Sequence, residues 1–66
     1  MKDTARIARA IARFTADAAA IEERLATLRA ECPSAAIFEA HPEVAWQRGR
    51  AASVDAMLVS LRAELR

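Results

Sequence analysis

The 66-residue sequence predicts an all-α fold: an antiparallel two-helix hairpin that dimerises into a four-helix bundle. Two observations predict the hairpin. Apolar residues recur at alternating steps of three and four along both halves of the chain, and a proline-containing linker separates the halves. The composition predicts the dimer. Hydrophobic residues make up 55% of the chain, but half of them are its 18 alanines. The remaining larger apolar side chains are too few to close a core without a partner.

The first predicted helix covers residues 3–31. Its apolar residues follow intervals of 4, 3, 4, 3, 4, 3 and 4, the pattern of a helix that packs along one stripe. Asp3 or Thr4 can cap its first turn, and Pro33 ends it because proline disfavours helical geometry in the residue before it. The stripe consists of Ile7, Ile11, Phe14, Ala18, Ile21, Leu25, Leu28 and Cys32.

The linker covers residues 32–42 and the second predicted helix covers residues 43–65. Ser34 can cap a single helical turn over 35–40, and Pro42 suits the first turn of the second helix with His41 as its cap. Gln47 is the one polar residue of the second stripe, where it can select a register or a pairing partner. This stripe consists of Ile37, Ala40, Val44, Gln47, Ala51, Val54, Leu58, Leu61 and Leu65.

We therefore expect one helical-hairpin domain over residues 1–66, whose two stripes supply both the core and the dimer seam. Three apolar residues outside the stripes are candidate partner contacts. Trp46 and Met57 share a line beside the second stripe, and Phe38 can close one end of the core. Trp46 has the alternative of packing on Pro42 and stacking with Arg50. The candidate seam residues are Ile7, Ile11, Phe14, Ile21, Leu25, Leu28, Val44, Gln47, Val54, Leu58, Leu61 and Leu65.

Ten Lys and Arg residues against nine Asp and Glu residues leave a formal charge of +1, so no global imbalance requires a nucleic-acid or membrane partner. Basic residues nevertheless gather where the hairpin is predicted to be open. They offer a candidate face for RNA or DNA phosphates. The alternatives are a solvated surface, or basic ends that meet acidic ends across an antiparallel dimer. The candidate nucleic-acid contacts are Lys2, Arg6, Arg9, Arg13, Arg62 and Arg66.

Enzymatic and metal-dependent functions find little support. Cys32, Ser34, Glu39, His41 and Glu43 gather around the linker, but the chain has one Cys, one His and no CxxC or HExxH motif. Packing and helix capping account for each of these residues. We expect no catalytic residue, no metal and no cofactor.

The sequence predicts a cytoplasmic protein that does not associate with membranes. No apolar run approaches the ~20 residues of a membrane span, the N-terminus lacks the apolar segment of a secretory signal, and one unpaired cysteine fits a reducing compartment. The expected function is that of a small non-enzymatic adaptor, regulator or inhibitor that acts through self-association and protein binding. The alternative is a four-helix-bundle regulator that binds RNA or DNA through its basic face.

Overall fold

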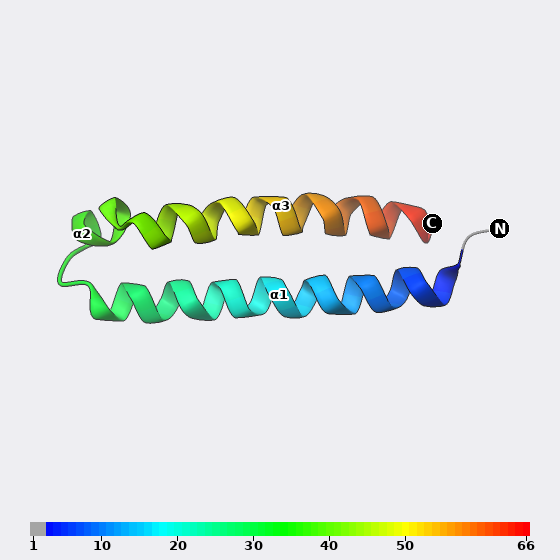
Figure 1. Cartoon of the computed structure of the whole chain (residues 1–66), viewed down its shortest axis with the longest axis horizontal. Coiled ribbons are helices and arrows are strands. Elements are labelled where there is room, and N and C mark those ends of the chain that lie inside the picture. The colour runs from blue at the N-terminus through cyan, green and yellow to red at the C-terminus, as the bar shows by residue number, and fades with distance from the viewer. Residues whose placement is uncertain (1–2) are drawn as a thin grey trace.

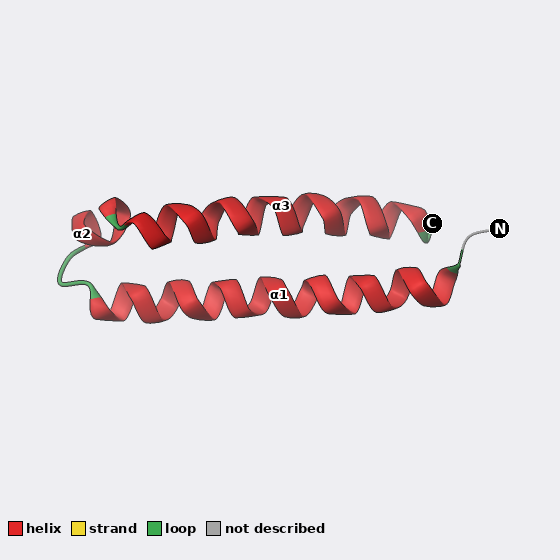
Figure 2. Cartoon of the chain, in the orientation of Figure 1, coloured by secondary structure: helices red, strands yellow, loops and turns green. Residues whose placement is uncertain are grey.

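The computed structural model describes residues 3–66, which form the three helices α1 (Thr4–Glu31), α2 (Ala35–Ala40) and α3 (Pro42–Glu64). Helices α1 and α3 run antiparallel side by side, and α2 lies at the turn (Figure 1). The start of α1 and the end of α3 lie together at the other end, called the open end below. The described residues contain helices and loops but no strand (Figure 2), and the chain measures 52 × 15 × 15 Å. The predicted helical hairpin is confirmed.

Helix α1 begins and ends where local sequence signals place its ends. The carboxylate of Asp3 accepts a hydrogen bond from the backbone N–H of Arg6 at 3.0 Å, so Asp3 rather than Thr4 is the cap. Cys32 takes an extended conformation (φ −86°, ψ 132°), as expected for a residue that precedes proline. The chain leaves the helix at this point and turns toward α2.

Two capping contacts position α2 and α3. The Ser34 hydroxyl accepts the Ile37 N–H at 3.2 Å, and the Nδ1 atom of His41 accepts the Glu43 N–H at 3.1 Å. Pro42 is the first residue of α3, where its lack of an N–H costs nothing. Because both caps satisfy backbone donors at helix starts, the turn is an ordered element.

The tightest packing lies at the turn end. Leu28, Phe38 and Val44 form a buried cluster, with Leu25 and Cys32 partly buried against it. Toward the open end Leu58 is buried, but Ile7, Ile11 and Leu61 are half-buried, because only two helices are present to cover them. The buried residues in the described part of the chain are Ile21, Leu28, Phe38, Val44, Gln47 and Leu58.

The second stripe is shorter than the sequence predicts. Ile37 is 50% exposed, Ala40 is exposed, and Leu65 is 42% exposed. The prediction that the stripe runs through the linker is wrong because His41 is extended (φ −72°, ψ 127°), which separates α2 from α3. Residues at heptad spacing lie on one stripe only when a continuous helix connects them. Leu65 lies at the C-cap, after the last residue of α3.

Candidate interaction surfaces

The two stripes face each other within one chain. Apart from Ile37, Ala40 and Leu65, their members are buried or half-buried. The two stripes therefore pack mainly against each other within one hairpin. A second hairpin can reach only the edges that remain accessible. The half-buried candidate seam residues are Ile7, Ile11, Phe14, Leu25, Val54 and Leu61.

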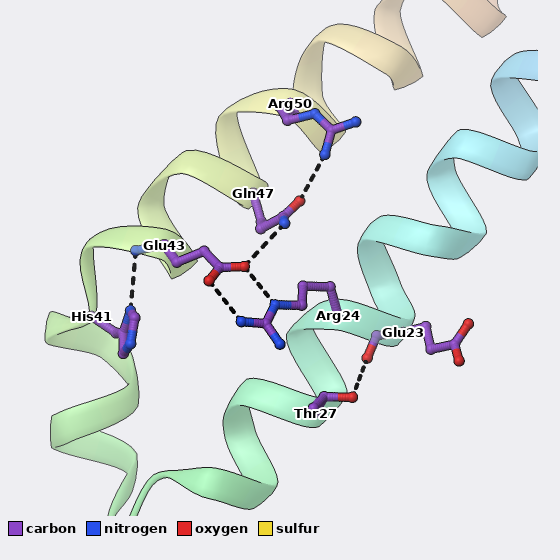
Figure 3. Close-up of polar contacts among 7 residues, drawn as sticks. All are labelled: Glu23, Arg24, Thr27, His41, Glu43, Gln47 and Arg50. Carbon is purple, nitrogen blue, oxygen red and sulfur yellow. Dashed lines mark hydrogen bonds and ion pairs between the residues drawn. The ribbon is translucent and has the colours of Figure 1, made fainter.

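A polar network crosses from α1 to α3 beside the core (Figure 3). The guanidinium of Arg24 donates two hydrogen bonds to the carboxylate of Glu43, at 2.6 and 2.8 Å. The Gln47 side chain donates to Glu43 at 3.3 Å and accepts from Arg50 at 3.2 Å. Gln47 is 5% exposed, and these bonds satisfy its amide. The stripe's polar residue therefore finds its partners within its own chain.

The ion pair changes the titration of both partners. The hydrogen bonds from Arg24 are the main reason that the pKa of Glu43 falls to about 2, with smaller contributions from the Gln47 amide and nearby positive charge. The same hydrogen bonding raises the pKa of Arg24. Glu43 thus stays ionised, and continues to accept the Gln47 amide, at acidic pH values where an ordinary glutamate is protonated.

Phe38 is buried by its own chain. It is 8% exposed, packs with Leu28 and Val44, and has the guanidinium carbons of Arg29 and Arg48 at 6.0 and 5.5 Å from its ring centroid. The expectation that Phe38 is available to a partner is corrected, because α2 turns this ring onto the core. The sequence-based alternative, closure of one core end, is what the structure contains.

A second bidentate ion pair holds the Arg48 guanidinium near the Phe38 ring. Arg48 donates to the carboxylate of Glu39 at 2.5 and 2.9 Å and so links α3 to α2. This contact lowers the pKa of Glu39 and raises the pKa of Arg48. Two interhelix ion pairs therefore stand on either side of the turn-end core.

Trp46 and Met57 remain exposed, at 60% and 46%. The Arg50 guanidinium lies 5.0 Å from the Trp46 ring centroid, as expected from the one-turn spacing. A shallow hollow lies beside the ring, where Gly49 has no side chain and a Cβ atom there would meet nothing within 4 Å. The hollow is lined by Ala45, Trp46, Gly49, Arg50, Ser53 and Val54.

These exposed side chains share one face of the hairpin with a line of charged residues on α1. Trp46, Arg50 and Met57 follow Glu43 at steps of 3, 7 and 14, so they lie on the Glu43 flank of α3. Because Glu43 forms an ion pair with Arg24, the side of α1 that carries Arg24 lies on this same face. By the same spacing, that flank carries Arg6, Arg13, Asp17, Arg24 and Glu31. We call this combined surface the Trp46 face.

The candidate nucleic-acid contacts lie at the open end. Arg6 is 3.8 Å from Asp3 and forms an ion pair within α1. The predicted Lys2 contact falls outside the described residues. Among these candidates, the guanidiniums that have no ion pair with a described carboxylate are those of Arg9, Arg13, Arg62 and Arg66.

Within residues 3–66, no group of three or more His, Cys, Asp and Glu side chains is placed to hold a metal ion. None of the helices over these residues has the length and apolar character needed to cross a bilayer. The linker residues act locally, since Ser34 and His41 cap helices while Glu39 and Glu43 pair with arginines. Compared with known proteins, the chain matches no protein-family model, no curated protein and no solved structure.

Proposed function

We propose that this chain is a non-enzymatic helical-hairpin protein of the cytoplasm that self-associates and acts by binding another protein, as an adaptor, regulator or inhibitor. The observation that carries the proposal is the exposure of Trp46 and Met57 on one face of a hairpin with a small core. Large apolar side chains grouped on a face commonly mark a site where another macromolecule binds.

The dimensions of the hairpin support the same proposal. In a hairpin 15 Å wide every residue lies close to solvent, and only five hydrophobic residues are buried in the described chain. Ordering costs ~1.5 kcal/mol per residue, so a 66-residue chain needs more apolar burial than one pair of stripes provides. A second hairpin over the half-buried stripe edges would supply that burial.

Sedimentation equilibrium on the full chain over a hundredfold concentration range tests self-association. We expect a monomer–dimer equilibrium, weakened at least tenfold in a Trp46→Ala/Met57→Ala variant. The matched control is Ile37→Ala/Val59→Ala, which removes two exposed apolar residues from other surfaces and should dimerise as the wild type does. A wild-type chain that sediments as a monomer throughout would contradict the proposal.

A second candidate function, binding of RNA or DNA, is favoured by the contrast between the two ends of the hairpin. Near the turn, Glu43 and Glu39 hold Arg24 and Arg48, and Arg29 and Arg50 lie over the rings of Phe38 and Trp46. Several open-end arginines have neither a described acidic partner nor a ring contact. A guanidinium without a carboxylate partner remains available for phosphate oxygens.

Titration with mixed RNA and DNA at several salt concentrations tests this candidate. Binding should weaken as salt rises, and Arg9→Gln/Arg13→Gln should reduce the slope of log K against log salt by about two. An Arg29→Gln/Arg50→Gln control removes the same charge near the turn and should leave the slope unchanged. Absence of binding at low salt would eliminate the candidate.

A further inference from the structure

We infer that the Trp46 face docks a second copy of this chain with the turns of the two hairpins at opposite ends, so that Trp46 of each copy packs on Met57 of the other. This inference rests on the proposed self-association and specifies its face and orientation. It is carried by three observations: the size of the face, the distribution of charge along the hairpin, and the spacing of the two exposed side chains.

The face has the size that a stable dimer needs. The hairpin is 52 Å long and 15 Å wide, and a face of these dimensions has a footprint close to the ~800 Å² that each partner buries in a standard interface. A contact confined to the Trp46 side chain and its hollow would cover a small part of that footprint. The dimer therefore has to use the length of both helices.

Two symmetric arrangements can bring the same face of two hairpins together. If the two-fold axis is parallel to the helices, the turns lie at the same end and α3 packs on α1 of the second copy. If the axis is perpendicular to the helices, the turns lie at opposite ends and each helix packs antiparallel on its own equivalent. The two arrangements differ in which charges meet.

The charges favour turns at opposite ends. The turn half of the hairpin, residues 17–50, carries four cations and six acids, whereas the described open half, residues 3–16 and 51–66, carries five cations and three acids. In a dimer with its turns at opposite ends, the basic half of each hairpin packs on the acidic half of the other. In a dimer with its turns at the same end, halves of like charge pack together. On the Trp46 face itself, Arg6 and Arg13 then lie toward the half of the second α1 that carries Glu31.

The apolar side chains favour the same arrangement. Trp46 and Met57 are eleven residues apart, or ~16 Å along α3. When α3 packs antiparallel on its equivalent with the axis midway between them, each Trp46 meets the thioether of the other copy's Met57, at two symmetric places. Gly49 and Ser53 lie between these positions and form part of the hollow, so the helices can approach.

The alternative arrangement gives Trp46 no comparable contact. With the turns at the same end, Trp46 would face α1 of the second copy. Every large apolar residue of α1 belongs to its stripe, and its flank on the Trp46 face carries charged residues and Ala20. Both observations thus select the perpendicular axis.

Pulsed dipolar EPR on the full chain measures the orientation directly. A spin label is attached at Ala36→Cys in a Cys32→Ser background, since Ala36 is exposed on α2. We expect a label–label distance between ~30 Å and the 52 Å hairpin length. The lower limit is twice the distance along α3 from its first residue to the midpoint of the Trp46–Met57 pair. A distance near the 15 Å width would overturn the inferred orientation.

A label at Ser53→Cys in the same background tests the face. Ser53 lies close to the inferred axis, so its label–label distance should be much shorter than that from Ala36, whereas a label at Ala26, on the opposite flank of α1, should give a distance longer than that from Ser53. A dimer whose Ala26 labels are closer than its Ser53 labels uses another face, which refutes the inference. A chain without any intermolecular signal at high concentration refutes self-association itself, so the two failures are distinguishable.

Discussion

At the scale of single residues, Gln47 is a polar side chain on the apolar stripe of α3 that faces the core. A buried amide without partners costs ~1–3 kcal/mol, but Glu43 and Arg50 supply both an acceptor and a donor. The sequence shows that Gln47 belongs to the stripe. It does not show the Arg24–Glu43 pair on which the network depends, since that pair reflects the axial register of residues 19 positions apart.

The depressed pKa of Glu43 makes the hairpin sensitive to acid. Its pKa is about 2 in the folded chain against 4.5 for a free glutamate, so its contribution to stability is fully present above pH 4.5 and is lost as the pH falls toward 2. Melting temperatures followed by circular dichroism should therefore fall more steeply over this range in the wild type than in Glu43→Gln.

Glu22→Gln is the matched control for this experiment, because Glu22 is an exposed α1 glutamate that forms no ion pair with a described residue. The Glu22 variant should follow the wild-type acid profile. Parallel profiles for wild type and Glu43→Gln would show that the Arg24–Glu43 pair does not stabilise the fold.

The burial of Phe38 predicts a large difference between two neighbouring substitutions in α2. Phe38→Ala removes an 8% exposed ring from the core and should cost ~3 kcal/mol of unfolding free energy, enough to unfold much of a marginal chain. Ile37→Ala truncates a half-exposed side chain and should cost less than ~1 kcal/mol. Urea unfolding measures both, and equal losses would mean that Phe38 does not close the core.

At the scale of elements, the sequence predicts what local signals determine. Asp3, Ser34 and His41 cap helices where cap residues are expected, and the helix bounds agree with the predicted bounds to within one residue. The direction of α2 is not local, because it depends on the extended backbone at His41 and on the fit of Phe38 against Leu28. For that reason the sequence assigns Ile37 to the stripe, and the structure buries Phe38 instead.

Helix α3 contains one residue that weakens it and packs against nothing within its own hairpin. Gly49 is exposed in the middle of the helix, and a Cβ atom there would touch no neighbouring atom. In the dilute, monomeric chain, Gly49→Ala should therefore raise the unfolding free energy by ~0.5–1 kcal/mol through helix propensity, measured by urea unfolding. The reciprocal substitution Ala52→Gly, at an exposed position of the same helix, should lower it by a similar amount. A loss of stability in the monomeric Gly49→Ala chain would contradict this prediction, whereas a loss seen only where the chain dimerises would indicate close approach of the second copy at Gly49.

At the scale of the whole molecule, packing is uneven along the hairpin. The buried cluster and both interhelix ion pairs lie toward the turn, whereas the open end has half-buried stripe residues and arginines without described acidic partners. An antiparallel dimer would place the well-packed end of each hairpin over the open end of the other. The sequence predicts the need for a partner from composition alone, but the relevant face depends on how the two helices are rotated about their axes.

If the folded state is a dimer, its stability has to depend on concentration. A hundredfold dilution removes ~2.7 kcal/mol from the free energy that holds two chains folded, which corresponds to a fall of ~10 °C in the melting temperature of so small an assembly. Circular dichroism at 222 nm over that range measures the shift. Trp46→Ala/Met57→Ala should melt lower at every concentration, because its dimer is weaker. A wild-type melting temperature that ignores dilution would mean that α1 and α3 hold each other folded unaided, and the exposed Trp46 face would then need a partner other than this chain.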